Sequence, residues 1–272
     1  MKAIVNTIVA GLYKEPDLQS TLLDEALYGM VVEILAEPYP GWVQVRTHYR
    51  YEGLMSLGAL LMDASGWETL PKKVVRSKNF CDVLSEPKVQ GRRICHLTRG
   101  CVISPVGEPS DGWQRVRLAD GQLGYVMDGI LAPHHDAPLS EDESVLRQAL
   151  VDAAMLYEGT HYRWGGKSPM GIDCSGMVSM AYMLCGILIH RDANIEPGFP
   201  IHEIALEDAK MGDLLFFPGH VAMYLGDGRF CHSTARAGAD GFTINSLNPA
   251  HPEYREDLKN RLTQVGSYFT KG

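Results

Sequence analysis

The segment Gly171-Ile172-Asp173-Cys174-Ser175-Gly176 places a cysteine where an irregular, glycine-containing stretch gives way to a helical pattern. Apolar residues then recur at helical spacing, which predicts a helix over residues 175–186. The first N–H groups of a helix lack partners within it, and the helix dipole is positive at that end. This setting favours a thiolate, so the sequence predicts Cys174 as a nucleophile with a lowered pKa. A small thiol buried under a turn is the alternative.

Two histidines follow in a region that predicts three short antiparallel strands. Turn-forming residues at Pro218-Gly219 and Asp227-Gly228 separate three apolar runs. His220 opens the second run and His232 lies in or just after the third, so neighbouring strands can bring them together on one face. A thiol nucleophile needs a base, and the base needs an orienting partner. Cys174, His220 and His232 are predicted to fill these roles in that order.

Other interpretations of the same residues are weaker. Each histidine taken alone could be a structural residue with satisfied hydrogen bonds. A zinc site could use Cys174, Cys231, His220 and His232, but these residues lack the paired close spacing of such sites. Cys231 and His232 are also adjacent, so on a strand they point to opposite faces. We therefore expect neither a metal nor an organic cofactor.

Several motifs along the second half of the chain occur in the order known from one family. They are Tyr162-Arg163-Trp164-Gly165-Gly166, Asp173-Cys174-Ser175-Gly176, Gly212-Asp213-Leu214-Leu215-Phe216-Phe217, Gly219-His220-Val221 and His232. Together they resemble the NlpC/P60 cysteine peptidases, which cut bacterial cell-wall peptides with a papain-like fold and a Cys-His-His triad. The resemblance covers residues 141–272. It implies that Cys174 is the nucleophile, His220 the base and then the acid, and His232 its orienting residue.

The resemblance also suggests which residues contact the substrate. Tyr162 matches a tyrosine that the family commonly places near the oxyanion. Asp173 and Ser175 flank the nucleophile at positions that touch the substrate backbone, although capping of the helix is a compatible role. Arg191 matches the arginine of the family's Arg-x-Ser segment and is predicted to pair with a substrate carboxylate. Ala193 stands where that segment has serine, so one hydroxyl contact is missing.

The first half of the chain is an internal repeat with a shift of 71 residues. Gly29-Met30-Val31-Val32 aligns with Gly100-Cys101-Val102-Ile103, and the Gly-Trp segment beginning at Gly41 aligns with the one beginning at Gly112. Short alternating apolar stretches between turn residues predict two small β-barrels, which resemble bacterial SH3 domains. The predicted organisation is α+β: SH3-like domains at 1–66 and 67–132, a linker at 133–140 and a papain-like peptidase domain at 141–272.

The first barrel carries two further candidates. In tandem-SH3 enzymes of the family, the first module closes one end of the catalytic cleft. An acidic residue and a tyrosine of that module meet a free amine at the substrate N-terminus. The resemblance implies that Glu25 and Tyr51 have these roles here, and Tyr51 departs from the repeat because its counterpart is Gln122. A solvated surface glutamate is the alternative for Glu25, and targeting to the cell wall is another role for SH3 modules.

The linker is polar and contains proline, and a helix is predicted to follow it. Ser140 could cap a helix that begins at Glu141, in which Val145, Ala149 and Leu156 recur at helical spacing.

Composition narrows the partners and the compartment. A net charge of −8 without Lys/Arg-rich runs argues against nucleic acid. No segment is long enough to span a membrane, and the N-terminal stretch lacks the apolar core and cleavage site of a signal peptide. Six cysteines without framework spacing fit a reducing compartment. We therefore expect a cytoplasmic monomer.

These observations together predict a cytoplasmic cysteine peptidase that acts in murein recycling. Its substrates would be freed cell-wall peptides with an N-terminal L-alanine, cut at the γ-D-glutamyl bond to the following diamino acid. An amidase or acyltransferase of the same fold is one alternative, because a thioester can pass its acyl group to any acceptor. A non-catalytic wall-binding protein is the other.

Overall fold

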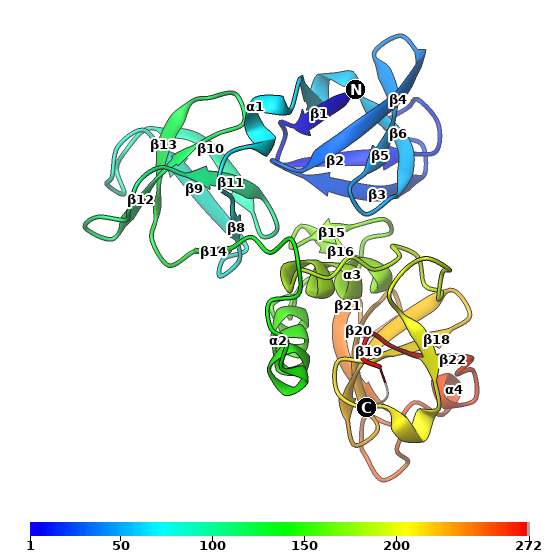
Figure 1. The fold of residues 1–272 in the computed structure, drawn as a ribbon. Coiled ribbons are helices and arrows are strands. Elements are labelled where there is room, and N and C mark those ends of the chain that lie inside the picture. The colour runs from blue at the N-terminus through cyan, green and yellow to red at the C-terminus, as the bar shows by residue number, and fades with distance from the viewer. Residues whose placement is uncertain (271–272) are drawn as a thin grey trace. The chain divides into compact units, whose positions relative to one another are not determined.

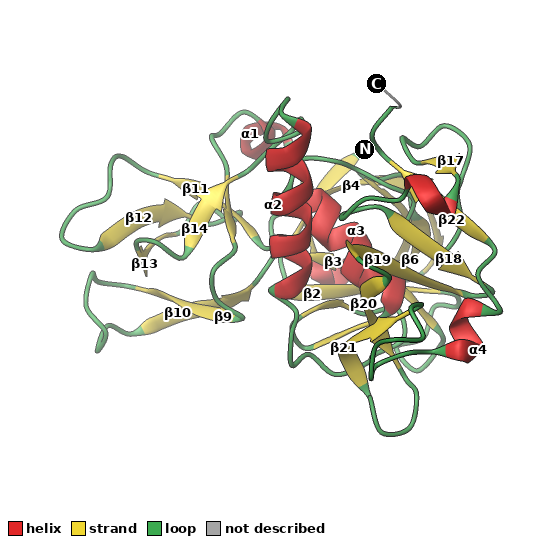
Figure 2. Ribbon diagram, turned by 90° about the horizontal axis from the view of Figure 1, so that it is seen from below, coloured by secondary structure: helices red, strands yellow, loops and turns green. Residues whose placement is uncertain are grey.

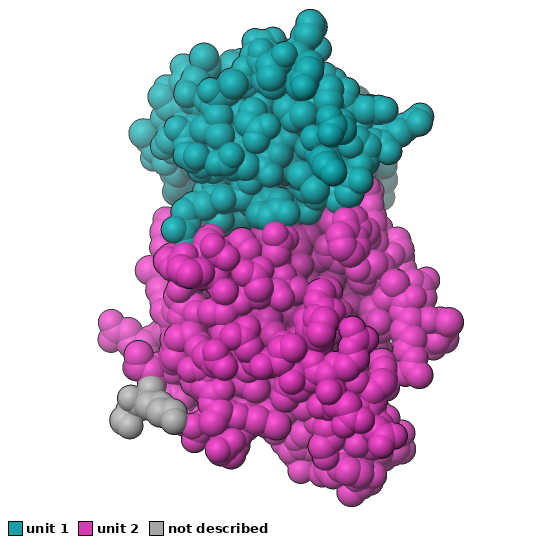
Figure 3. Space-filling model, turned by 90° about the vertical axis from the view of Figure 1, so that its right-hand side faces the viewer, with its two compact units in different colours: residues 1–134 teal, residues 135–272 magenta. Residues whose placement is uncertain are grey.

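The computed structural model describes residues 1–270, and the chain divides into two compact units, Met1–His134 (unit 1) and His135–Gly272 (unit 2) (Figure 3). Unit 1 is built almost entirely from strands and loops, and the long helices belong to unit 2 (Figures 1 and 2). The fold therefore contains both helices and strands, as predicted, with a mostly β N-terminal region that is compatible with SH3-like modules.

Unit 1 contains two antiparallel sheets of seven strands each. The first comprises β1 (Lys2–Val5), β2 (Val9–Tyr13), β3 (Leu22–Leu27), β4 (Val31–Tyr39), β5 (Trp42–Thr47), β6 (Glu52–Ser56) and β7 (Leu60–Met62). The second comprises β8 (Lys73–Val75), β9 (Phe80–Leu84), β10 (Arg93–Thr98), β11 (Val102–Pro105), β12 (Trp113–Arg117), β13 (Leu123–Met127) and β14 (Leu131–Pro133). The strand orders are β3-β2-β6-β5-β4-β1-β7 and β10-β9-β13-β12-β11-β8-β14, so each strand corresponds to the one seven places later.

The repeat also preserves a glycine that each sheet requires. Gly53 on β6 pairs with Val45, and its counterpart Gly124 on β13 pairs with Val116. A Cβ atom would lie 2.9 Å from the Leu12 side chain at Gly53, and 2.5 Å from the Val83 side chain at Gly124. Neither position can hold a larger residue without moving the strand beside it, because folded interiors are closely packed.

Contacts within unit 1 join its two sheets. The short helix α1 (Ser65–Glu68) follows β7 and the 3-10 turn η1 (Leu57–Ala59), and its Trp67 indole donates to Gly29 O over 2.9 Å. The N–H of Val102 donates to Tyr28 O over 2.8 Å. Trp67 and Val102 also pack with Ile4 in a shared apolar cluster. The turn at residues 28–29 therefore links the two repeats.

Unit 2 is centred on a six-stranded antiparallel sheet with the order β17-β22-β18-β19-β20-β21. Its strands are β17 (His202–Ile204), β18 (Leu214–Phe217), β19 (His220–Gly226), β20 (Arg229–Thr234), β21 (Gly241–Ser246) and β22 (Gln264–Ser267). The remaining elements are α2 (Glu143–Met155), α3 (Cys174–Leu184), α4 (Glu256–Lys259), the 3-10 turn η2 (Leu206–Asp208) and the hairpin β15 (Lys167–Ser168) and β16 (Gly171–Ile172). Strands β18, β19 and β20 are the three that the sequence predicts.

Helix α2 begins two residues later than the sequence analysis expects. Asp142 is its N-cap, and the Asp142 carboxylate accepts from the N–H groups of Ser144 and Val145. Ser140 instead accepts from the N–H of Asp142 over 3.1 Å. The buried face contains Leu146 and Leu150, whereas Val145 is 49% exposed. Aspartate is a strong cap that satisfies two amides here, which explains why it displaces Ser140 from that role.

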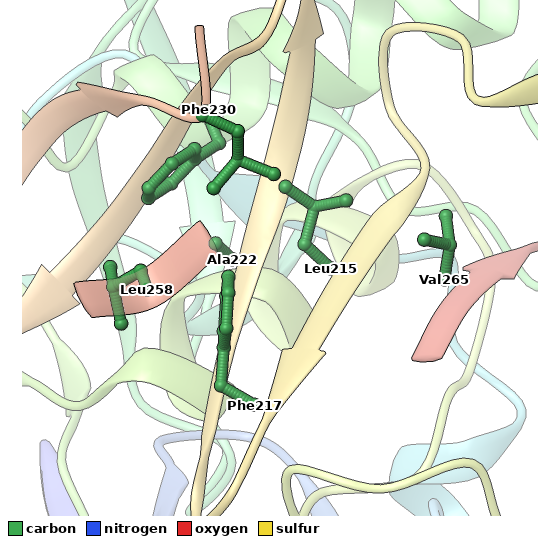
Figure 4. Packing of buried hydrophobic residues seen from close by; sticks show 7 residues of the cluster. Leu215, Phe217, Ala222, Phe230, Leu258 and Val265 are labelled. Atoms are coloured by element: carbon green, nitrogen blue, oxygen red, sulfur yellow. The ribbon is translucent and has the colours of Figure 1, made fainter. Parts of the chain in front are cut away.

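An apolar cluster covers the face of the sheet that carries the histidines. Leu215, Phe217, Ala222 and Phe230 of β18, β19 and β20 pack in one cluster with Leu258 of α4 and Val265 of β22 (Figure 4). Side chains alternate along a strand, so His220 lies on the same face as Ala222, and His232 on the same face as Phe230. Ring centroids lie 5.9 Å apart for Phe217 and His220 and 5.1 Å apart for Phe230 and His232. Both imidazoles therefore sit against apolar rings.

Candidate active site

The N-cap of α3 positions the cysteine. Asp173 has extended backbone, and its carboxylate accepts from Gly176 N–H over 2.6 Å and from Gly165 N–H over 2.8 Å. Cys174 is the first residue of the helix, which thus starts one residue before the predicted range. The two hydrogen bonds of Asp173 tie the Trp-Gly-Gly motif to the start of α3.

Close backbone contacts explain the glycines around the cysteine. A Cβ atom on Gly176 would lie 2.2 Å from Gly166 O, so only glycine allows the first turn of α3 to approach the Gly165-Gly166 segment. The Ser233 hydroxyl of β20 donates to Ile172 O over 2.7 Å. This bond anchors the segment before Cys174 to the strand that carries His232.

A buried ion pair lies behind the start of α3. The Arg191 guanidinium donates to both carboxylate oxygens of Asp173, each over 3.0 Å, and to the Ser175 hydroxyl over 2.6 Å. The Arg191 side chain is 1% exposed. We call Asp173, Ser175 and Arg191 the helix-side network. Asp173 is a cap, and Arg191 has an internal carboxylate partner, so these contacts favour a positioning role. Substrate contacts by the three residues stay predictions.

A second group of polar residues runs across the sheet. His220 Nε2 lies 2.6 Å from His232 Nδ1, and His232 Nε2 lies 3.0 Å from Asn245 Oδ1. Arg255 donates through Nη1 to the same Asn245 oxygen over 3.3 Å, and through Nε and Nη2 to the Asp257 carboxylate, each over 2.7 Å. We call these five residues the sheet-side network. Asn245 and Arg255 were not identified from the sequence.

The thiol lies beside Val221, the residue that follows the first histidine. Helix α3 packs against β19, and the N–H of Val221, the residue after His220, donates a hydrogen bond to the Cys174 thiol group. Tyr162 also lies near Cys174. Burial and then the charge of Cys174 raise the pKa of the Tyr162 phenol to about 12. The structure therefore places Tyr162 and the residue after His220 near Cys174, and it joins His220 to His232.

Burial decides the protonation states in this site. Burial and then the charge of Asp173 raise the pKa of the Cys174 thiol to about 11. Burial, followed by Arg255 and Arg261, lowers the pKa of His220 to about 4. Burial and then His220 lower the pKa of His232 to about 3. The resting site at neutral pH thus holds a thiol and two neutral imidazoles. The expectation of a lowered Cys174 pKa is wrong, because removal of the thiol from water outweighs its place at a helix start.

Glu25 and Tyr51, the two candidates of the first barrel, belong to unit 1. Glu25 is fully buried on β3, so it is not the solvated surface glutamate of the alternative interpretation. Its neighbour Asp24 is also buried and accepts from the Tyr49 hydroxyl over 2.6 Å. Tyr51 is half-buried just before β6, and its N–H donates to the Thr47 hydroxyl over 2.9 Å. Their contact with a substrate amine stays a prediction.

No group of three or more His, Cys, Asp or Glu side chains within residues 1–270 is arranged to hold a metal ion. All six cysteines are free thiols. None of the helices in the same range has the length and hydropathy needed to cross a membrane.

A cysteine at the start of a helix that packs against the histidine-bearing strand of an antiparallel sheet is the arrangement of a papain-like cysteine peptidase. Residues 159–257 match the model of the NlpC/P60 family. The chain is also 45% identical to dipeptidyl-peptidase 6 of Lysinibacillus sphaericus, over 99% of this chain and 100% of that protein. The chain therefore belongs to the NlpC/P60 family, as the motifs indicate.

Two further similarities agree with this assignment. A crystal structure of an NlpC/P60 family protein from Bacillus cereus superposes with a TM-score of 0.80 at 23% identity, over 98% of this chain and 99% of that one. This likeness shows a common fold across both units. The gamma-D-glutamyl-L-lysine dipeptidyl-peptidase of Bacillus cereus is 36% identical over 44% of this chain and 37% of its own length. The chain is thus a peptidase of a family with cell-wall peptidases among its members.

Proposed function

We propose that this protein is a cysteine peptidase that hydrolyses the γ-D-glutamyl bond to the following diamino acid in freed cell-wall peptides. The observation that carries the proposal is the position of Cys174 at the start of α3, where its thiol accepts from the N–H of Val221, the residue after His220, together with the His220–His232 hydrogen bond of 2.6 Å. The choice of bond is supported by relatives named gamma-D-glutamyl-L-lysine dipeptidyl-peptidase.

The chemistry begins with two neutral groups. Cys174 Sγ attacks the γ-carbonyl carbon of D-glutamate while its proton passes to His220. The carbonyl oxygen becomes an oxyanion, which backbone N–H groups at the start of α3 and the Tyr162 hydroxyl can stabilise. The C–N bond then breaks, and His220 gives its proton to the departing amine of the diamino acid. A water molecule then gives a proton to His220 as it attacks the thioester carbonyl. The C–S bond breaks, His220 returns the proton to Cys174 Sγ, and the released γ-carboxylic acid loses its proton to solvent.

The proposed substrate is a peptide with a free N-terminal L-alanine. Glu25 would hold the terminal ammonium together with Tyr51. A buried carboxylate discriminates between a free and an acylated amine, because a neutral terminus leaves the charge without a partner. All six cysteines are free thiols, which supports action on freed peptides in the cytoplasm, as part of murein recycling.

The test is an incubation with defined muropeptides, with and without the attached sugar, followed by mass analysis of the products. We expect a free L-Ala-γ-D-Glu dipeptide from sugar-free substrates and little product from sugar-linked ones. Release of amide-transfer products in place of the dipeptide would indicate an acyltransferase. Equal rates on both kinds of substrate would contradict the preference for freed peptides.

The Glu25→Gln variant tests how the terminal amine is recognised. We expect it to lower kcat/KM for free-amine peptides by about a hundredfold and to reduce their advantage over N-acetylated ones, since a charged hydrogen bond contributes about 1.5–3 kcal/mol. Glu52→Gln is the matched control, because Glu52 is an exposed residue of the same barrel that pairs with Arg46. Equal effects of both substitutions would remove Glu25 from the site.

A further inference from the structure

The sheet-side network includes the Arg255 guanidinium, whose role in its hydrogen bonds is certain. A guanidinium only donates hydrogen bonds. The Asn245 side-chain atom that faces Arg255 Nη1 at 3.3 Å must therefore be the oxygen, and the amide nitrogen then donates to Glu253 O over 3.4 Å. Arg255 and the Glu253 carbonyl thus favour the same orientation of the Asn245 amide, and Arg255 is the side chain that faces its oxygen.

The orientation of this amide determines the proton positions on both imidazoles. Asn245 Oδ1 also faces His232 Nε2 at 3.0 Å, and an oxygen can only accept, so the proton of neutral His232 is on Nε2. His232 Nδ1 then carries a lone pair, and His220 Nε2 must donate to it across 2.6 Å. Neutral His220 has one ring proton, so its Nδ1 is free to accept the proton of the thiol.

We propose that Arg255 is a positioning residue that keeps His220 in the tautomer able to act as a base, by fixing the orientation of the Asn245 amide. If the amide were turned, its NH2 group would face His232, and both imidazoles would have to exchange their donor and acceptor atoms. His220 Nδ1 would then carry a proton and could not accept another. This inference deepens the proposed function and rests on it.

The protein holds Arg255 firmly from the solvent side. Its N–H donates to Ser246 O over 2.8 Å, and its side chain is 11% exposed beneath the paired Asp257, which is 57% exposed. Removal of the guanidinium therefore leaves Asp257 in contact with water and no buried charge without a partner. A variant at this position is expected to fold.

The experiment compares Arg255→Met with Arg261→Met. Both arginines lower the pKa of His220 through their charge, but Arg261 is exposed and serves as the control for charge alone. We expect Arg255→Met to lower kcat about tenfold and to leave KM little changed. A hydrogen bond to a charged group shifts an equilibrium, here the orientation of the Asn245 amide, by about this factor. Arg261→Met should keep its kcat near that of the wild type. Equal losses in the two variants would overturn the proposal, since they would reduce Arg255 to a charge.

A double variant separates positioning from structural support. In the Asn245→Ala variant there is no side-chain amide whose orientation could be fixed. Adding Arg255→Met there should change kcat by less than about twofold, because the two effects are coupled. A further loss as large as that in the wild-type background would contradict the proposal.

Nitrogen-15 NMR of the histidine rings gives a readout that does not depend on turnover. The wild type should show protonated Nε2 and unprotonated Nδ1 on both His220 and His232, and Arg255→Met should show a mixture. A wild type with this pattern but no hydrolysis would sink the proposed function alone. An unchanged pattern in Arg255→Met would sink the role of Arg255 alone.

Discussion

The two groups of polar residues that border Cys174 differ in charge. The helix-side network contains a buried carboxylate and a buried guanidinium in bidentate contact, with an exposed fraction of 9% for Asp173 and 1% for Arg191. The sheet-side network contains two imidazoles that burial keeps neutral. Its ion pair, Arg255 with Asp257, lies at the outer end, where Asp257 is 57% exposed.

This difference separates the roles of holding the nucleophile and moving its proton. A buried ion pair with satisfied hydrogen bonds resists any change of protonation, because loss of either charge leaves the other without compensation. It can therefore fix Asp173 as the cap of α3. Two neutral imidazoles joined by one hydrogen bond can accept a proton and return it, because no ion pair holds either ring in one charge state. Substitutions in the helix-side network should then reduce stability, and substitutions in the sheet-side network should reduce turnover.

Removal of the nucleophile should give the largest effect. Cys174→Ala is expected to lower kcat by about 10⁴-fold or more, since triad members act as a unit. The urea midpoint should stay nearly unchanged. Turnover is measured by mass analysis of muropeptide products. Cys231→Ala is the matched control, because this buried cysteine adjoins His232 but points to the opposite face of β20. If the Cys174 variant kept activity near that of the wild type, the nucleophile would be misassigned.

The histidines come next, in an order that identifies the base. His220→Ala should lower kcat by about 10³-fold or more, because it removes the group that accepts the thiol proton. His232→Ala should lower kcat by about 10- to 100-fold, because it orients His220 and leaves the base in place. Steady-state kinetics on one free peptide measures both. The reverse order would exchange the roles of base and orienting residue.

Breaking the helix-side network should reduce stability. Asp173→Ala removes the cap and leaves Arg191 buried without its carboxylate, so we expect a loss of about 3–5 kcal/mol in the free energy of unfolding. Urea denaturation measures the change. Asp142→Ala is a matched control, since Asp142 caps α2 without a buried arginine, and we expect a much smaller loss from it. Similar losses in the two variants would mean that the Asp173–Arg191 pair contributes little.

Local sequence patterns predicted the parts of the site that depend on neighbouring residues. Turn residues at Pro218-Gly219 and Asp227-Gly228 mark β18, β19 and β20, and strand alternation places His220 and His232 on one face. Cys174 stands at the change from irregular chain to helix. The repeat of 71 residues corresponds to two sheets with the same strand order.

Properties that depend on packing were not predictable in this way. Asn245 is an ordinary polar residue of an alternating strand, and its bond to Arg255 depends on how residues 247–254 fold back to the sheet. The pKa of Cys174 depends on how much water the finished fold removes, which a helix start alone does not reveal. The repeat likewise conserves the scaffold of unit 1 but not the two candidate residues of the first barrel, since Glu25 corresponds to His96 and Tyr51 to Gln122.

The smallest predicted effect is the pH dependence of the free energy of unfolding that arises from the sheet-side network. Burial lowers the pKa of His220 from 6.5 to about 4. Between these values the unfolded chain binds a proton that the folded protein does not, so stability falls as pH decreases. From pH 7 to pH 5 we expect His220 to lower the free energy of unfolding by about 2 kcal/mol, since a tenfold change in a protonation equilibrium corresponds to about 1.4 kcal/mol. Urea denaturation at both pH values should show a smaller loss in His220→Asn, because asparagine takes up no proton. An equal loss in that variant would mean that His220 is not the buried neutral group on which the comparison of the two networks depends.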